Sequence, residues 1–271
     1  MTIRLKRPVR RAFRAMADPR NVRSLCSTVL CLRGWARAKW GQPDASREVV
    51  LDLRYSRLCV DIARAEIVSF WEVVHERCYD PIALDYPVCV VDVGANIGAF
   101  SLYQAITKHA ERVIAFEPSP QVFPRLLKNV ELNGLGNVTA INAAVGDMAG
   151  LLSFSEGRMS MNGHVSESGP LKVPCVTLDG ELRDIPRIDI LKIDTEGYEA
   201  QVLRGASDVL TRTQRIAVEL HYPSEREEID SLVLSQGFVR PRSIIIWFFT
   251  VGRLVELQTL YHLLVAPQLA C

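Results

Sequence analysis

The sequence predicts an α/β fold, a doubly wound and mostly parallel sheet that ends in a C-terminal antiparallel hairpin and follows an N-terminal helical extension. Three observations predict it. From residue 88 onward, short apolar runs alternate with stretches of helical length, as in parallel strands joined by crossover helices. The last two apolar runs have no helical stretch between them. The first 47 residues differ from the remainder in charge and show helical periodicity.

Composition excludes several classes of protein. Of 271 residues, 48% are hydrophobic and 23% charged, which is ordinary for a folded chain and excludes a disordered or collagenous one. The seven cysteines form no CxxC pair, so we expect a reducing compartment rather than a disulfide framework or a zinc site. Apolar stretches fall well short of the ~20 residues of a membrane helix, and the N-terminus lacks the features of a signal peptide. We therefore expect a cytoplasmic protein.

The N-terminal extension, residues 1–47, is strongly basic. It holds twelve basic and two acidic residues, a net charge of +10 within a chain whose total is +1. Apolar side chains from Leu5 to Met16 share one helical face, and Asp18-Pro19 can begin a second helix. Such a segment could attach residues 1–40 to a membrane surface or another polyanion, or pack on the domain as a solvated helix.

Residues 48–271 are expected to form a single domain. Its predicted strands are 49–54, 58–62, 88–93, 112–117, 138–145, 151–155, 172–177, 189–194, 215–221, 238–240 and 244–251. Its predicted helices are 67–75, 98–109, 120–133, 199–210 and 225–236. A polar loop, 156–169, interrupts the alternation, and Pro241-Arg242 is the expected turn of the final hairpin.

A glycine loop lies where the first parallel strand meets its helix, in Asp92-Val-Gly94-Ala-Asn96-Ile-Gly98. Glycine lets the backbone approach a ligand closely, and a helix N-terminus favours an anionic group. The dinucleotide fingerprint needs a second glycine where Asn96 stands, so S-adenosylmethionine is favoured over NAD. Glu117 ends the next strand 23 residues after Gly94, near the offset of an acidic residue that binds ribose.

These motifs resemble the FkbM-type S-adenosylmethionine-dependent methyltransferases. The resemblance rests on DVGANIG (92–98), FEPSP (116–120), LNGLGNV (132–138), AAVGD (143–147) and LKIDTEGYE (191–199). It implies a class I methyltransferase (Rossmann-like) fold and methylation of a hydroxyl on a sugar, glycolipid or natural product. It also implies roles for single residues. The loop residues Asp92, Gly94, Ala95, Asn96 and Gly98 would hold the methionyl end, Glu117 the ribose, and Ala144 with Asp147 would lie near the adenine.

Polar residues also gather at the ends of two later strands: Lys192, Asp194, Glu196, Glu219 and His221. Ligands of open α/β sheets bind at the carboxyl ends of strands, so Asp194 is expected to face the cofactor and take part in the chemistry. Glu196 is expected to cap the following helix. His221 is the first candidate for the general base, because imidazole titrates near neutrality, and His164 in the polar loop is the second. A magnesium site of Asp194, Glu196 and His221 is a weaker alternative.

One row of charge is expected to cross the sheet. Lys192 lies in a strand covered on both faces, where an unpaired ammonium would be costly. Asp92 and Glu219 occupy comparable places in the neighbouring strands, so the sequence predicts an Asp92–Lys192–Glu219 row beneath the cofactor.

Other functions stay open at this point. An RNA or protein methyltransferase could dock through the basic extension, although the remainder of the chain carries a net charge of −9, which disfavours a nucleic-acid partner. A nicotinamide-dependent oxidoreductase and a cofactor-binding protein without catalysis are the remaining alternatives.

Overall fold

The computed structural model describes residues 47–239 and 246–251, apart from residues 54–55 and 76. The helices expected in the basic extension and the turn expected at Pro241-Arg242 lie outside the described residues.

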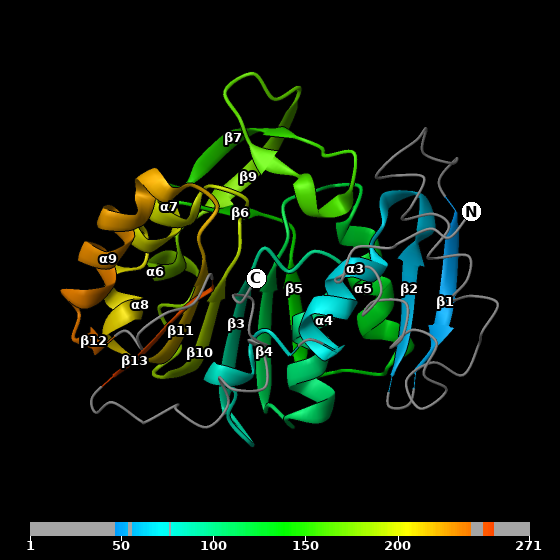
Figure 1. Cartoon of the computed structure of the whole chain (residues 1–271), viewed down its shortest axis with the longest axis horizontal. Helices are drawn as coiled ribbons and strands as arrows, with labels where there is room; N and C mark the ends of the chain where they lie inside the picture. The colour runs from blue at the N-terminus through cyan, green and yellow to red at the C-terminus, as the bar shows by residue number, and fades with distance from the viewer. Residues whose placement is uncertain (1–46, 54–55, 76, 240–245, 252–271) are drawn as a thin grey trace, which may run out of the picture.

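The centre of the domain is a seven-stranded sheet of order β12-β13-β11-β10-β3-β4-β5 (Figure 1). Its strands, in chain order, are β3 (Cys89–Val93), β4 (Arg112–Phe116), β5 (Val138–Ile141), β10 (Ile188–Ile193), β11 (Thr213–Glu219), β12 (Phe238–Val239) and β13 (Ile246–Val251). β13 is antiparallel to both of its neighbours, and the strands from β11 to β5 are parallel. This confirms the predicted class I methyltransferase fold with its antiparallel C-terminal hairpin.

Two smaller sheets flank the central one. β1 (Glu48–Asp52) and β2 (Arg57–Asp61), which correspond to the first two predicted strands, form an antiparallel hairpin. The second sheet has the order β6-β9-β7-β8 and lies over the carboxyl ends of the central strands (Figure 1). Its strands are β6 (Ala144–Val145), β7 (Gly150–Ser155), β8 (His164–Val165) and β9 (Leu171–Val176).

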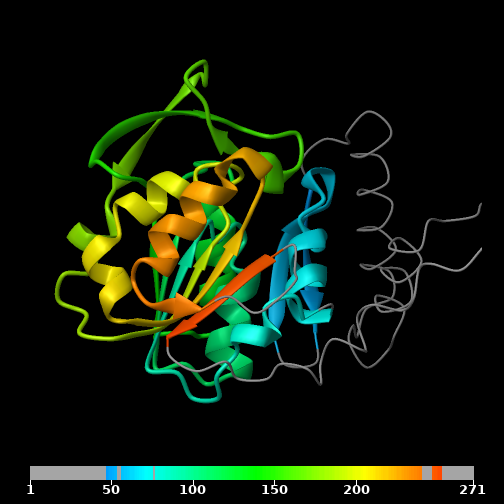
Figure 2. The ribbon, with the colours of Figure 1, turned by 60° about the vertical axis from the view of Figure 1, so that its left-hand side comes forward.

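The helices cover both faces of the central sheet (Figure 2). They are α3 (Ile67–Phe70), α4 (Ala99–Leu102), α5 (Phe123–Leu132), α6 (Leu178–Glu181), α7 (Glu199–Arg204), α8 (Ser207–Thr211) and α9 (Arg226–Leu234). α3 and α4 each continue as one π-helical turn, and 3-10 turns occupy Ile62–Arg64, Asp80–Ile82, Ser160–Asn162 and Pro223–Glu225. Within the described residues, no helix has the length and apolarity to cross a bilayer.

Strand alternation divides the core between the two faces. In β3, Val91 and Val93 pack with the side chains of α7–α9, whereas Val90 packs with Phe100 and Tyr103 on the opposite face. All of β3 and β10 is buried, as expected for central parallel strands covered on both faces.

Two predicted elements are divided in the structure. The run 138–145 separates into β5 and β6, which belong to different sheets. The helix predicted over 199–210 breaks at Gly205, where a Cβ would lie 2.0 Å from the carbonyl oxygen of Gly146. The close approach of these two backbones requires glycine, and the chain restarts as α8.

The charged row across the sheet is confirmed in one half and wrong in the other. Lys192 is paired in register with Asp92, and its Nζ lies 3.1 Å from Asp92 Oδ1. Its register partner on β11 is Ala217, so Glu219 stands two residues further toward the carboxyl end. Lys192 instead reaches Asp194 Oδ2 at 3.4 Å. Burial lowers the pKa of this ammonium, but the carboxylates of Asp92 and Asp194 outweigh burial and raise it.

Replacing Lys192 by Met should destabilise the fold strongly, because it leaves Asp92 buried without its cation. We expect a loss of about 3–5 kcal/mol in the free energy of unfolding, measured by urea titration. Lys108→Met is the matched control, since the partner of Lys108, Asp85, is 78% exposed and such pairs contribute about 1 kcal/mol or less. Equal losses in the two variants would contradict this account of Lys192.

Candidate active site

The loop between β3 and α4 is fixed to both neighbouring strands. The amides of Gly94 and Ala95 donate to the carbonyl of Phe116 in β4, at 3.0 and 2.9 Å. Lys192 Nζ donates to the carbonyl of Gly94 at 2.8 Å from the other side. Gly94 has φ +75°, and a Cβ there would lie 1.8 Å from the carbonyl oxygen of Asp194. Only glycine therefore permits this contact between the loop and the end of β10.

Glu117 lies directly after β4 and faces the same loop. Its Oε2 accepts the amide of Asn96 and its Oε1 accepts the amide of Ser119, each at 2.8 Å. The residue is 7% exposed. Burial raises the pKa of Glu117 to about 7, against the opposing effect of the two amides and of Lys192.

The remaining residues expected at the cofactor differ in their surroundings. Asn96 has φ +52° and accepts the amide of Ile97 on its own side chain, while a Cβ at Gly98 would meet Leu126 at 2.5 Å. Ala144 is buried in β6, and Asp147 lies 3.7 Å from Arg204 at the end of α7.

Asp92 requires a correction. Direct contact with the methionyl end was expected, but Asp92 is fully buried and its carboxylate accepts the hydroxyl of Ser101 at 2.6 Å and pairs with Lys192. Asp92 supports the loop from below, because it holds the ammonium that binds the carbonyl of Gly94.

The geometry fits S-adenosylmethionine at this end of the sheet. β3 is the point where the chain order reverses between β4 and β10, and ligands of open α/β sheets bind at such points. A carboxylate has about four acceptor positions, and each oxygen of Glu117 accepts one amide hydrogen bond. Each oxygen thus keeps a position for a ribose hydroxyl.

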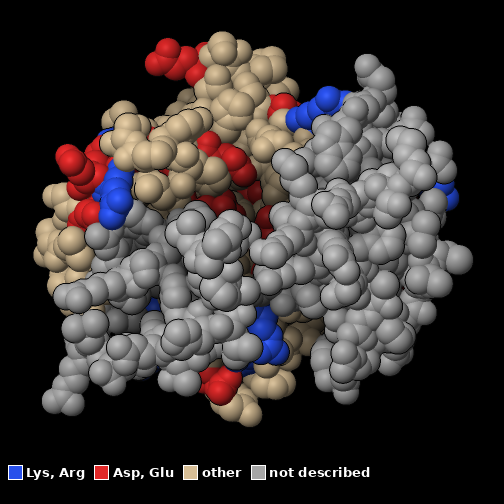
Figure 3. All heavy atoms as spheres, viewed as in Figure 1, with Lys and Arg blue, Asp and Glu red and all other residues tan. Residues whose placement is uncertain are grey.

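A second group of side chains lies beside this loop, at the carboxyl ends of β10 and β11. One potential metal-ligand atom from each of Asp194, Glu219 and His221 lies within 4.8 Å of the other two. His221 Nε2 is 3.4 Å from Glu196 Oε2 and 3.9 Å from Asp194 Oδ1. On the face of the molecule drawn in Figure 3, acidic side-chain atoms are visible deep in a recess near its middle. The structure thus brings together the residues that were expected to meet here.

Glu199, which the sequence analysis does not single out, organises this group. Its Oε1 accepts the amides of Thr195 and Gly197, both at 3.0 Å, and lies 3.1 Å from His221 Nδ1. The expected role of Glu196 as the cap is wrong, because no side chain caps α7 at its N-cap residue, Tyr198, and Glu196 turns to His221. The available signal was an acidic residue in the first turn of the predicted helix, a place where carboxylates are favoured.

The carboxylates around His221 determine its charge. Burial lowers the pKa of His221, but the hydrogen bonds and charges of Glu196 and Glu199 outweigh burial and raise it to about 11. His221 is therefore an imidazolium near neutral pH and has no free lone pair with which to accept a proton. A metal ion at Asp194, Glu219 and His221 would first have to displace that proton. His164 is exposed in β8, where its Nδ1 contacts the carbonyl of Asn162.

Unlike the protonated His221, Glu219 can accept a proton near neutral pH. Burial and the charge of Asp194 together raise the pKa of Glu219 to about 7, against the opposing charges of His221 and Lys192. The hydroxyl of Tyr79 donates to Glu219 Oε2 at 3.3 Å. A carboxylate with this pKa can exchange a proton near neutral pH.

Comparisons with known proteins find a matching family model and several similar methyltransferases. Residues 92–240 match the family model described as "Methyltransferase FkbM domain". The hexuronic acid methyltransferase AglP of Haloferax volcanii is 30% identical over 146 residues, which cover 52% of this chain and 59% of that protein. The methyltransferase sdnD of Sordaria araneosa is 27% identical and covers 68% of this chain and 86% of its own length. The 31-O-demethyl-FK506 methyltransferase FkbM of Streptomyces tacrolimicus is 29% identical, with coverages of 62% and 79%.

The imidazole of His221 should keep its proton between pH 6 and 9, which ¹⁵N NMR of the ring nitrogens can measure. Its folded pKa lies above the unfolded value of 6.5, so its stabilising effect is complete below about pH 6.5 and disappears as the pH rises toward 11. Glu199→Gln should lower this pKa. Glu228→Gln, which removes a carboxylate paired with Arg204, is the control. A neutral His221 at pH 7.5 in the wild type would contradict the assignment.

Proposed function

Since the chain belongs to the FkbM methyltransferase family, we propose that it transfers the methyl group of S-adenosylmethionine to a hydroxyl oxygen of a sugar, glycolipid or related natural product. The observation that carries the proposal is the place of Glu219, a carboxylate with a pKa of about 7 that lies within 4.8 Å of Asp194, whose backbone packs against the cofactor loop. A hydroxyl must lose its proton as its oxygen is methylated, and this carboxylate can accept it.

The cofactor would be held by the loop 94–98 and by Glu117. The sulfonium of S-adenosylmethionine supplies an electrophilic methyl group and a neutral leaving group. In the proposed arrangement Glu117 accepts the ribose hydroxyls, and the backbone from Gly94 to Gly98 borders the methionyl end. Ala144 and Asp147, which follow the strand next to Glu117, are the proposed neighbours of the adenine.

The names of the relatives support a hydroxyl acceptor. One is named a hexuronic acid methyltransferase, and another is named a 31-O-demethyl-FK506 methyltransferase. Both acceptors differ from nucleic acid. The alternative of an NAD-dependent oxidoreductase is not supported, because the chain belongs to a methyltransferase family.

The residues of the acidic group would divide the work of proton transfer. Glu219 is the proposed general base. His221 stays protonated, held by Glu196 and Glu199, and its charge faces Glu219 and Asp194. Methyl transfer is an in-line displacement, so most of the rate depends on how the acceptor oxygen is positioned. A positioned base adds about 10²–10⁴-fold.

Glu117→Ala should weaken binding of S-adenosylmethionine, because two charge-assisted hydrogen bonds to the ribose are lost. Each such bond contributes about 1.5–3 kcal/mol at most, so calorimetry should show a Kd at least tenfold higher. Glu111→Ala, on the strand-entry side of β4, is the control and should bind as the wild type does. Titration of the wild type with NAD should give no binding. An unchanged Kd in Glu117→Ala would remove this residue from the cofactor site.

Glu219→Gln should lower kcat by about 10²-fold or more, measured as transfer of radiolabelled methyl to hexuronic acids and neutral sugars. In the wild type, the rate should rise with pH through about 7 as Glu219 becomes ionised. This rise is the acidic limb of the pH–rate profile, and the Glu219→Gln variant should lose it. His221→Gln is the comparison, since it should keep a limb that depends on Glu219. Loss of the limb in His221→Gln together with its retention in Glu219→Gln would assign the base to His221.

A further inference from the structure

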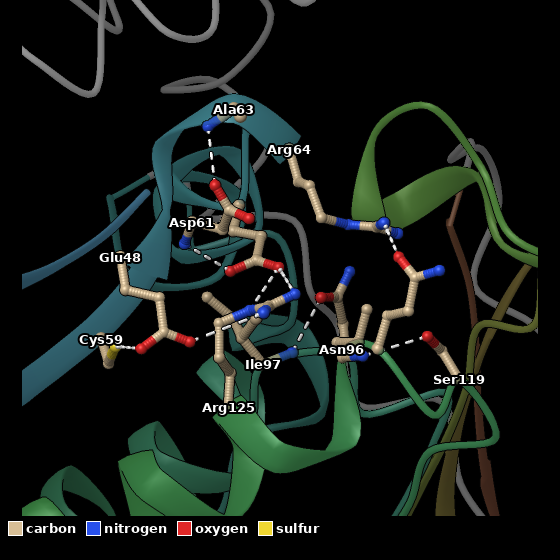
Figure 4. Close-up of polar contacts among 12 residues, drawn as sticks. Glu48, Cys59, Asp61, Ala63, Arg64, Asn96, Ile97, Ser119 and Arg125 are labelled. Atoms are coloured by element: carbon tan, nitrogen blue, oxygen red, sulfur yellow. Dashed lines mark hydrogen bonds and ion pairs between the residues drawn. The ribbon is translucent and has the colours of Figure 1, made fainter. Parts of the chain in front are cut away.

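Three segments that are distant in sequence meet next to Glu117. Arg64, in the 3-10 turn after β2, lies 3.0 Å from Glu156 Oε2, in the loop after β7, and contacts the carbonyl of Gly157 at 3.4 Å. A second guanidinium nitrogen, Nη1, donates to the side chain of Gln121. Figure 4 shows Arg64 directed away from the cluster around Asp61 and Arg125 and toward the segment that carries Ser119.

Ser119 connects this ion pair to Glu117. Its hydroxyl donates to Glu156 Oε1 at 2.6 Å, and its amide donates to Glu117 Oε1 at 2.8 Å. One residue therefore bridges two carboxylates. The side chains of Arg64 and Glu156 are only 15% and 14% exposed, so their charges are screened less than those of surface groups.

We propose that Glu156 and Arg64 are positioning residues for the cofactor, which through Ser119 fix the orientation and the charge of the Glu117 carboxylate. The proposal rests on the assignment of Glu117 to the ribose given above. Glu156 holds Ser119 in place by its hydroxyl, so that the Ser119 amide meets Glu117. Arg64 neutralises Glu156 and so limits the repulsion between the two carboxylates.

The charge of Glu117 depends on a small set of groups. The amides of Asn96 and Ser119 and the ammonium of Lys192 favour the ionised form, whereas burial and the charge of Glu156 favour the protonated one. The carboxylate must be ionised to accept both ribose hydroxyls. Cofactor affinity should consequently rise with pH through the pKa of Glu117, which is about 7.

Arg64 and Glu156 have opposite charges, so replacing each of them should shift the pH midpoint of cofactor binding in opposite directions. A purely structural role would not produce opposite shifts. Glu156→Gln removes a negative charge near Glu117 and should move the midpoint of the pH dependence downward by about 0.5–1 unit. Arg64→Gln leaves Glu156 without its cation and should move the midpoint upward by a similar amount. The charge-conserving variants Glu156→Asp and Arg64→Lys should keep the wild-type midpoint.

The experiment measures the Kd of S-adenosylhomocysteine by calorimetry from pH 5.5 to 8.5 on the full chain, so no acceptor is needed. Opposite shifts in Glu156→Gln and Arg64→Gln support the proposal. Shifts in the same direction, or unchanged midpoints, overturn it. If one of the two variants fails to fold, as shown by its melting temperature, the direction of the shift in the other variant decides.

Glu117→Gln separates this inference from the proposed function. It should bind more weakly than the wild type and lose the pH dependence near 7. If it binds as the wild type does, the assignment of Glu117 to the ribose fails and the inference fails with it. If Glu117→Gln behaves as expected while the Arg64 and Glu156 variants leave the midpoint unchanged, only the inference fails.

Discussion

The buried ammonium of Lys192 is the constraint on which the rest of the site depends. A charge that is 4% exposed in the middle of a parallel sheet must be surrounded by oxygen atoms. It finds them on three segments: the carboxylate of Asp92 in β3, that of Asp194 after β10, and the carbonyl of Gly94. One cation therefore holds the cofactor loop against the end of the strand that leads to the acidic group. The two halves of the site cannot move independently without exposing it.

Carboxylates outnumber cations in this region, and the imbalance explains the unusual ionisation of its members. Asp92, Asp194, Glu196, Glu199 and Glu219 face Lys192 and His221. The excess of negative charge keeps the proton on His221 and weakens the acidity of Glu219. In the proposed arrangement, it would also favour the cationic methyl donor over its neutral product, because the attraction of a negative site for the donor ends when the methyl group leaves.

The sequence alone predicts the features that depend on local pattern. Apolar runs locate β3, β4, β10 and β11, and the glycine loop with Glu117 identifies the cofactor side, because these signals lie within a few residues of each other. The partnership of Lys192 with Asp92 follows from the cost of an unpaired buried charge. The wrong position of Glu219 in that row has a physical cause, since the relative register of two parallel strands is determined by packing that the pattern does not encode.

Features that depend on distant contacts could not be predicted in this way. Glu199 contacts His221 across 22 residues, and Arg64 contacts Glu156 across 92. The choice of His221 as base assumed an imidazole with its ordinary pKa, and only the positions of Glu196 and Glu199 show that it is charged. Glu196 and Glu199 both precede or begin a helix, so the sequence does not distinguish the residue that accepts the backbone amides before α7 from the one that does not.

The position of β13 in the sheet has a consequence for how the protein is made. β13 lies between β11 and β12 although it follows both in the chain. During synthesis, the backbone of β11 leaves the ribosome with one edge unpaired, and that edge stays open until the residues of β13 have emerged. Pairing of this kind closes late and leaves an aggregation-prone edge exposed meanwhile. The sheet edge beside the strand that carries Glu219 is thus paired only after residues 246–251 have emerged, and a nascent chain that stops before β13 ends in an unfinished sheet.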